Sequence, residues 1–380
     1  MMDAISRLMG YGTESMERAR ESLNMLGDEL DTRIAQTPCE VVHEVDRVRL
    51  KRYKPKKESV EGKLPLVVVY ALINRETMLD LQPGRSVLEV FLESGLEVYM
   101  VDWGYPTRKD QFLTIDDYVN GYLDEMITFV CNEKKVPAVN VMGICMGGTF
   151  SVIYAAQHPE KVNALVTTVT PVFFDTDKGF LHSWMKDMDV DKLLGAWGNM
   201  PADVMNLGFL LLNPARLMVD KYQDFLRNMG DRDFVENFVR MEKWIFDSPD
   251  VPGATFRQFI VDCYQKNLLI QNKMKVGGKR VDLRKITMPL MNIYGKKDHL
   301  VPPEASRPLT EAVGSTNVRE LCLETGHIGI YVSAKCRNTF APEIVSWLAE
   351  NEPSSPLTPW AGVLENPSTQ SGGEHEGKTD

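Results

Sequence analysis

Hydrophobic and polar positions follow two different spacings along this chain. Continuous runs of β-branched and aliphatic residues at Leu66–Tyr70, Val139–Ile144 and Val162–Val169 are typical of strands buried on both faces. Apolar positions three and four residues apart, as in Ile115–Asn132, lie between these runs and predict amphipathic helices. Strands that alternate with helices favour a mostly parallel sheet with helices on both faces, so the pattern predicts an α/β fold. Within this fold we also expect helices at Val87–Ser94, Gly148–Gln157 and Thr339–Ala349. We expect further strands at Glu97–Val101, Pro289–Tyr294 and Val318–Leu323.

The alternation stops after Val169 and resumes near Pro289. Between these points the chain is rich in Met, Trp and Phe at helical spacing and shows no strand pattern. A helical block inserted into an α/β sheet is typical of a lid over an active site. We therefore expect a core formed by residues 39–171 and 286–351 and a helical cap, or lid, formed by residues 172–285.

The two ends of the chain differ from the core. Thr13–Ala35 has apolar residues at helical spacing among many Glu and Arg residues, which predicts an exposed amphipathic helix within an N-terminal segment of residues 1–38. Val41–Tyr53 alternates apolar and charged residues as half-buried strands do. Residues 352–380 are rich in Pro, Ser, Gly and acidic residues, so we expect a disordered acidic tail.

Composition and charge narrow the function classes. The chain has 380 residues, of which 43% are hydrophobic and 25% charged, as in ordinary globular proteins. Its net charge of −10 disfavours non-specific nucleic-acid binding, which depends on an excess of Lys and Arg. No apolar stretch approaches the about 20 residues of a transmembrane helix, and the N-terminus lacks the apolar core of a secretory signal. The six cysteines form no CxxC pair or zinc-ligand cluster, so we expect free thiols, a cytoplasmic location and no metal site.

The strongest chemical signal is the segment GICMGG at residues 143–148, between an expected strand and an expected helix. A nucleophile on such a sharp turn needs glycines two residues before and after it, because neighbouring backbone passes close by. Cys145 would be the nucleophile, and the N–H of Met146 would point toward an oxyanion formed there. The alternative is an inert buried cysteine that packs near glycines.

A nucleophile of this kind requires an acid and then a base further along the chain. Asp298 follows the expected strand at Pro289–Tyr294, and His327 follows the last expected strand, so these two residues appear in the required order. The alternatives are a turn or helix-capping role for Asp298 and an ordinary loop position for His327. His299, beside the acid, is expected to support the site from a second layer, although it is also an alternative base.

The loop after Leu66–Tyr70 completes the expected site. In enzymes with this kind of turn, that loop supplies the second oxyanion N–H, and Ile73 is our candidate. The alternative is an ordinary connecting loop. The other histidines, His43, His158, His182 and His375, are expected to be structural or surface residues.

A cysteine at this position favours acyl transfer over simple hydrolysis. An acyl group that arrives as a thioester moves to a cysteine at almost no cost in free energy and stays activated for attack by an oxygen nucleophile. A lid that excludes water would protect that acyl-enzyme.

These segments together resemble the polyhydroxyalkanoate synthases. The resemblance rests on GICMGG, YGKKDHLVPP, TGHIGIYVS, INRETMLDLQPGRSV and VDWGYP and covers roughly residues 40 to 350. The short chain and GHIGIYVS resemble the catalytic subunit of the two-component class III enzymes. The chain departs from the family in Met146, where Gln or Val is frequent, and in its acidic tail. The resemblance implies an α/β-hydrolase fold and polymerisation of (R)-3-hydroxyacyl-CoA, commonly 3-hydroxybutyryl-CoA, into polyester with release of CoA.

The same resemblance implies roles and partners. Cys145 would carry the acyl group, His327 would be the base, and Asp298 would orient His327; one or both would help to deprotonate the 3-hydroxyl of the incoming unit. The coenzyme A thioester is the substrate, and no cofactor is implied. The resemblance implies a second, non-catalytic subunit, homodimers or hetero-oligomers, and a cytoplasmic location at polyester granules.

Two other functions fit parts of the sequence. One is a hydrolase with a cysteine nucleophile, of the dienelactone-hydrolase kind, or a thioesterase, but such chains lack a lid of this size and the VDWGYP segment. The other is a non-catalytic granule-binding scaffold, which would not need a nucleophile, an acid and a base in order. Thiol release from an acyl-CoA, with or without polymer, separates the three.

Overall fold

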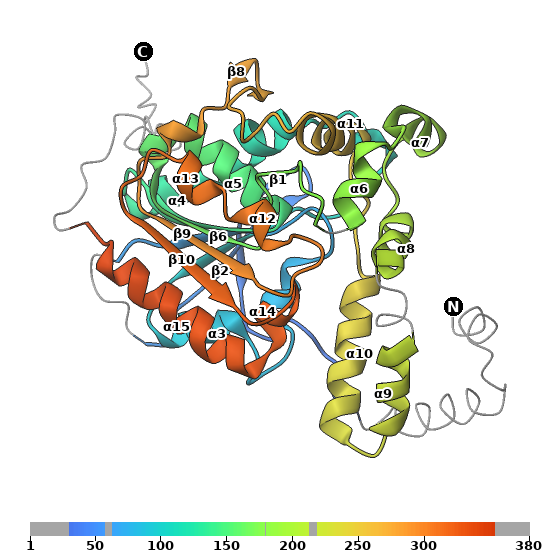
Figure 1. The fold of residues 1–380 in the computed structure, drawn as a ribbon. Coiled ribbons are helices and arrows are strands. Elements are labelled where there is room, and N and C mark those ends of the chain that lie inside the picture. The colour runs from blue at the N-terminus through green and yellow to red at the C-terminus, as the bar shows by residue number, and fades with distance from the viewer. Residues whose placement is uncertain (1–29, 58–62, 179, 213–218, 354–380) are drawn as a thin grey trace, which may run out of the picture.

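The centre of the protein is a mostly parallel sheet (Figure 1). The computed structural model describes residues 30–57, 63–178, 180–212 and 219–353, and within these ranges it contains one eight-stranded sheet. The first two strands of the chain form an antiparallel hairpin, and the second of them pairs antiparallel with the edge of the remaining six strands. Neighbours among these six strands are all parallel. In spatial order the strands are β1 (Glu40–Val45), β2 (Val48–Tyr53), β4 (Val98–Asp102), β3 (Leu66–Val69), β5 (Val139–Ile144), β6 (Val162–Thr168), β9 (Leu290–Gly295) and β10 (Val318–Leu323).

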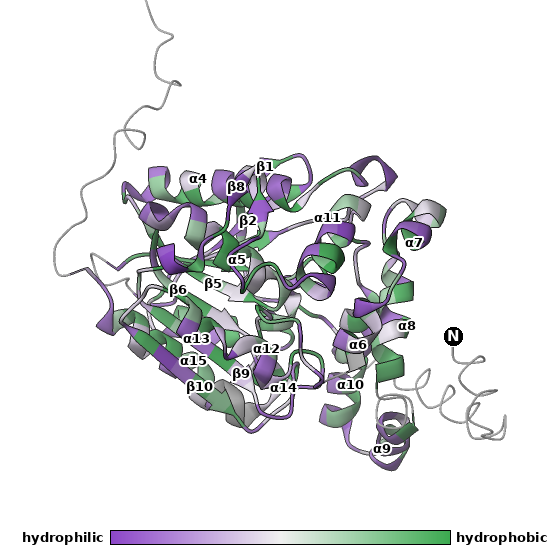
Figure 2. Ribbon diagram, turned by 45° about the horizontal axis from the view of Figure 1, so that its top comes forward, coloured by the Kyte–Doolittle hydropathy of each residue, from purple (hydrophilic) through white to green (hydrophobic). Residues whose placement is uncertain are grey.

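The central strands form the core because their side chains are apolar on both faces. Every residue of β3, β4 and β5 is buried, as the continuous hydrophobic runs predict. Figure 1 shows α3 and α15 along one face of the sheet and α4 and α5 along the other. The core helices are α3 (Val87–Glu93), α4 (Asp124–Lys134), α5 (Met146–Gln157), α12 (Pro303–Ser306), α13 (Leu309–Ala312), α14 (Gly329–Val332) and α15 (Ala334–Glu350), with 3₁₀ turns η1 (Glu76–Asp80), η2 (Arg108–Asp110), η4 (Pro159–Lys161) and η7 (Leu283–Lys285) and a π-helical segment η3 (Asp117–Leu123). Figure 2 shows hydrophobic residues concentrated on the strands and hydrophilic ones on outer turns of α4 and α15.

The N-terminal part differs from its sequence-based description in two ways. The alternating stretch at residues 41–53 is two strands, because Asp46 adopts a positive φ of 54° and turns the chain back on itself. Most of the helix expected at residues 13–35 lies outside the described residues, and its described end, residues 30–35, is not helical. Instead, side chains of the lid bond to this backbone: Arg240 donates to the carbonyl of Arg33, and the carboxylate of Glu236 accepts from the N–H of Asp31.

Between β6 and β9 the chain forms the helical lid. Figure 1 shows its helices beside the carboxyl edge of the sheet, with α9 and α10 extending away from the core. Its elements are α6 (Phe180–Lys186), α7 (Val190–Trp197), α8 (Ala202–Leu212), α9 (Lys221–Arg227), α10 (Arg232–Phe246), α11 (Gly253–Gln258), the π-helical η6 (Phe259–Gln265) and a short hairpin of β7 (Lys275–Val276) and β8 (Lys279–Arg280). The expectation that this block contains no strand is therefore wrong at the hairpin, where two-residue strands are too short to show a period. In the described part of the chain, no helix combines the length and apolarity needed to span a membrane.

Candidate active site

Cys145 lies on a sharp turn between β5 and α5. Its backbone angles, φ 52° and ψ −124°, are strained for a residue with a side chain, and α5 starts at the next residue. The N–H of Cys145 donates to the carbonyl of Thr168 at the end of β6, and its carbonyl accepts from the N–H of Thr149. The turn thus holds the thiol at the carboxyl edge of the sheet and at the amino end of a helix, where the helix dipole favours negative charge.

The glycines around Cys145 are required by close packing. A Cβ on Gly143 would lie 2.5 Å from the Cα of Gly148, and a Cβ on Gly147 would lie 2.3 Å from the carbonyl oxygen of Tyr70. Both distances are shorter than real Cβ contacts allow. The glycine spacing in the sequence therefore reflects the approach of α5 to the end of β3.

Asp298 and His327 come together although 29 residues separate them. Nδ1 of His327 donates to Oδ2 of Asp298 at 2.7 Å. The other carboxylate oxygen of Asp298 accepts the backbone N–H groups of Leu300 and Val301, each at 2.9 Å. The Asp298 side chain is fully buried. These contacts fix the carboxylate, which in turn fixes the orientation and tautomer of the imidazole.

The electrostatics of His327 depend on both neighbours. Burial is the largest influence and acts to lower its pKa, but the charges of Asp298 and Cys145 and hydrogen bonds to both raise the pKa to about 10. These two neighbours therefore stabilise the protonated imidazole of His327. This arrangement is that of a nucleophile, a base and an orienting acid.

One cavity of about 390 Å³ contains the thiol and the imidazole. The core contributes the first residue of α5, Met146, and loop residues, among them Ile73, His299 and Gly326. The lid contributes mainly apolar walls: Leu181, Phe209, Leu210, Trp244, Ile245, Phe259 and Tyr264. An apolar cavity with a few convergent polar groups is typical of a small-molecule site.

The remaining predicted site residues also lie at this cavity. Ile73 and Met146 line it together with Cys145, which places both loops that could supply oxyanion N–H groups beside the thiol. His299 lines the cavity as well, but it is His327 that bonds to Asp298. The geometry therefore favours His327 over His299 as the base.

His182 is buried. Of the two possibilities expected from the sequence, a structural residue or a surface residue, the second is wrong. It is 2% exposed and packs among the rings of Phe174 and Tyr264. Burial lowers its pKa to about 4, so it is neutral near pH 7. The structural role is the one that fits.

Among the described residues no group of three or more His, Cys, Asp or Glu side chains is arranged to hold a metal ion.

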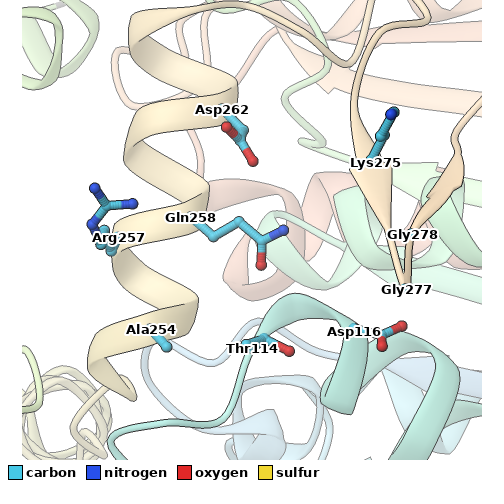
Figure 3. A pocket seen from close by; sticks show the side chains of 9 residues that line it. All are labelled: Thr114, Asp116, Ala254, Arg257, Gln258, Asp262, Lys275, Gly277 and Gly278. Carbon is cyan, nitrogen blue, oxygen red and sulfur yellow. The ribbon is translucent and has the colours of Figure 1, made fainter.

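A second cavity, of about 590 Å³, lies at a different place (Figure 3). Gln258 and Asp262 extend toward it from the α11–η6 helix, opposite the β7–β8 hairpin that carries Lys275. Arg257, on the other side of that helix, pairs with Asp191. None of Cys145, Asp298 or His327 lines this cavity, and its charges are mixed in sign.

Sequence reasoning missed the lid residues of the site. Asn206, Lys221 and Tyr264 all line the catalytic cavity. Nothing in their spacing distinguishes them from other polar and aromatic residues of the helices. Only the packing of the lid on the core brings them to Cys145.

Comparisons with known proteins agree with this site. A family model of the alpha/beta hydrolase fold matches residues 65–334, and a model of the poly-beta-hydroxybutyrate polymerase (PhaC) N-terminus matches residues 13–91. The chain is 44% identical over 350 residues to the poly(3-hydroxyalkanoate) polymerase subunit PhaC of Thiocystis violacea, an alignment that covers 92% of this chain and 96% of that protein. The corresponding protein of Allochromatium vinosum is 44% identical over 346 residues, which cover 91% and 95%. The chain belongs to the PhaC family of poly(3-hydroxyalkanoate) polymerases.

Membership of the PhaC family confirms the resemblance seen in the sequence motifs, together with the expected fold and the acyltransferase class of enzyme. The chain is also similar in fold to a soluble variant of monoglyceride lipase from Saccharomyces cerevisiae. That likeness has a TM-score of 0.51 at 12% identity and covers 86% of this chain and 98% of the lipase chain. At this identity it concerns the fold alone.

Proposed function

We propose that this chain is the catalytic subunit of a class III polyhydroxyalkanoate synthase, which polymerises (R)-3-hydroxyacyl-CoA, commonly 3-hydroxybutyryl-CoA, and releases CoA. The observation that carries the proposal is that Cys145 and His327 line one apolar cavity and that Asp298 is bonded to His327. Relatives 39–44% identical to the chain, each a poly(3-hydroxyalkanoate) polymerase subunit, support it.

The first step of the proposed reaction is acylation of Cys145. The Cys145 thiolate attacks the thioester carbonyl, the new S–C bond forms, and the bond from that carbon to the sulfur of CoA breaks. The N–H groups of Met146 and Ile73 stabilise the oxyanion in between. The imidazolium of His327, held by Asp298, gives its proton to the departing CoA thiolate.

The second step is chain transfer. Neutral His327, oriented by Asp298, accepts the proton of the 3-hydroxyl of an incoming unit. The hydroxyl oxygen attacks the acyl carbon on Cys145, an ester bond forms, and the Cys145 thiolate leaves. Apolar walls from the lid exclude water, which would otherwise end the chain by hydrolysis.

The proposal includes a second, non-catalytic subunit, assembly into homodimers or hetero-oligomers, and a cytoplasmic location at polyester granules. Lid residues form walls of the cavity at Cys145, and in this proposal the lid opens for substrate and leaves an exit for polymer. Large apolar side chains are exposed on it, among them Trp184, Trp197, Leu207 and Leu211. Exposed apolar surface of this kind supports a contact with another macromolecule.

The decisive experiment is incubation of the purified chain with (R)-3-hydroxybutyryl-CoA, alone and with a second subunit. We expect thiol release together with insoluble polyester. Thiol release with free 3-hydroxybutyrate and no polymer would instead assign the chain to the hydrolases or thioesterases. No thiol release in either mixture would instead indicate the non-catalytic granule-binding scaffold.

A further inference from the structure

The lid is bonded directly to the loop that carries Ile73. The indole N–H of Trp244, near the end of α10, donates to the carbonyl of Arg75 at 2.8 Å. The side-chain amide of Asn74 donates to the carbonyl of Ile245 at 3.3 Å. The last turn of α10 is therefore in hydrogen-bond contact with the two residues that follow Ile73.

Asn74 is held in a conformation that needs support. Its φ is 60°, in the left-handed region, which Asn enters more readily than most residues but at a cost. Its backbone N–H donates to the hydroxyl of Ser248, just beyond α10, at 3.1 Å. Since the N–H of Asn74 belongs to the peptide group that follows Ile73, the Ser248 bond restrains the backbone at Ile73 itself.

Core contacts anchor the other side of the same loop. Arg75 pairs with Glu76 and with Asp102, at 3.0 Å each, and Lys51 bridges the same two carboxylates at 2.7 Å each. All four side chains of this ionic cluster are largely buried. The loop is thus fixed by the core at Arg75 and by the lid at Asn74, with Ile73 directly before them.

We propose that Asn74, Trp244 and Ser248 are positioning residues that make the oxyanion site depend on the docked lid. When α10 is docked, its end holds Asn74 in the left-handed conformation and aims the N–H of Ile73 at the reacting carbonyl. When α10 moves away, Cys145, His327 and Asp298 stay in place, because their bonds are made within the core, but the second oxyanion donor is lost. The inference rests on the proposed acylation of Cys145.

The test compares two reactions of Cys145, of which one forms an oxyanion. In the first, p-nitrophenyl acetate acetylates the thiol: an S–C bond forms, the ester C–O bond breaks, and p-nitrophenolate leaves. In the second, iodoacetamide alkylates the thiol by displacement of iodide, with no oxyanion. For Ser248→Ala and Trp244→Phe we expect the single-turnover acetylation rate to fall by about 10- to 100-fold. This loss is no larger than the effect of removing an oxyanion donor. The alkylation rate of both variants should stay within about twofold of wild type.

Two further variants make the result specific. Ser248→Thr keeps a hydroxyl acceptor and is expected to acetylate at near the wild-type rate. Asn199→Ala removes a different bond between lid and core, from the amide of Asn199 to the carbonyl of Thr107 at 2.9 Å, and is expected to leave both reactions within about twofold. Unchanged acetylation in Ser248→Ala and Trp244→Phe would overturn the proposal. Equal loss of both reactions would also overturn it, because a general disturbance of the fold would then be the cause.

The ester assay separates this inference from the proposed function. If the wild type is acetylated by p-nitrophenyl acetate but not acylated by 3-hydroxybutyryl-CoA, the proposed substrate is wrong while the coupling between lid and oxyanion site is still decided. If the acyl-CoA reacts but the variants behave as wild type, only the coupling is wrong.

Discussion

The loops at the carboxyl edge of the sheet and the helices of the lid contribute to one cavity in different ways. Cys145, Asp298 and His327 follow β5, β9 and β10, which lie within four adjacent positions of the sheet. Asp298 is bonded to His327 and to the backbone N–H groups of Leu300 and Val301, all within the core. The lid contributes apolar walls from several helices that are far apart in the sequence.

The core loops therefore provide the reactive groups, and the lid provides the surroundings of the cavity. The reactive groups are held by bonds made within the core, so we expect them to keep their places when the lid moves. The walls and the contact at Asn74 depend on how helices pack on the core. Substitutions in the core should therefore change reactions at the Cys145 thiol in general, and substitutions or partners that act on the lid should change access, water exclusion and the oxyanion site.

The largest effect is expected for Cys145→Ala. Removal of the thiol should abolish both CoA release and covalent acyl labelling from 3-hydroxybutyryl-CoA, because Cys145 is the single cysteine among the described residues that line the cavity. Cys39→Ala and Cys322→Ala, which change exposed thiols, and Cys263→Ala, which changes a buried one, are the matched controls and should label normally. Comparable labelling of the Cys145 variant would show that the nucleophile lies elsewhere.

The next largest effect is expected at His327. His327→Gln removes proton transfer to and from the thiol, so single-turnover acylation should slow by about 10²- to 10⁴-fold. Asp298→Asn should retain more acylation, because the imidazole is still present, but should impair repeated chain transfer. Rapid-quench measurement of the first acyl transfer distinguishes the two variants.

His299→Gln provides the control for this assignment. His299 lines the cavity but is not the residue bonded to Asp298, so a mild loss of activity is expected. A severe loss in His299→Gln with an active His327→Gln would reverse the assignment of the base.

A smaller effect concerns the lid. A closed and an open state that differ by a few kcal/mol leave the isolated chain mostly closed, and a second subunit that binds the open state raises the competent fraction. Specific activity should then rise by roughly 10- to 100-fold with added subunit, since each 1.4 kcal/mol corresponds to a factor of ten. The lag before polymer formation should shorten at the same ratios. Full activity without a lag in the chain alone would contradict both the closed lid and the two-subunit assembly.

The smallest effect is on stability. The pKa of His327 is raised to about 10 from an ordinary value of 6.5, so between these pH values the folded chain binds a proton that the unfolded chain does not. The stabilisation is complete below pH 6.5 and is lost as pH rises toward 10, with a slope of at most about 1.4 kcal/mol per pH unit. Urea unfolding across this range should show a flatter pH dependence in His327→Gln than in the wild type. An identical dependence would mean that the imidazole does not hold its proton in the folded state.

The sequence predicts the core better than the lid. The strands β3, β5, β6 and β9 follow from largely apolar runs, because a strand buried on both faces has to be mainly apolar. The cavity positions of Cys145 and His327 follow from a turn motif and from chain order. The tight turn at Asp46 and the two-residue strands β7 and β8 do not show in the pattern, because neither spans a full period.

The lid side of the site could not be derived in the same way. Phe209 and Tyr264 face Cys145 while Leu207, two residues from Phe209, is exposed. Helix α8 (ADVMNLGFLLL), which carries Leu207 and Phe209, is apolar over much of its surface, so its pattern does not show which side meets the core. The hydrogen bond from Asn74 to Ser248 joins residues 174 positions apart, and no local sequence pattern predicts it.

The most direct test of the central claim is to locate the acyl group after brief reaction with (R)-3-hydroxybutyryl-CoA. Cleavage after Lys135 and Lys161 yields a peptide of residues 136–161 in which Cys145 is the sole cysteine. We expect mass spectrometry to find 3-hydroxybutyryl units on this peptide, in a thioester that hydroxylamine removes, and longer oligomers on it as the reaction proceeds. Acyl groups on a different peptide, or steady CoA release with none on this one, would contradict the assignment of Cys145 as the residue that carries the growing chain.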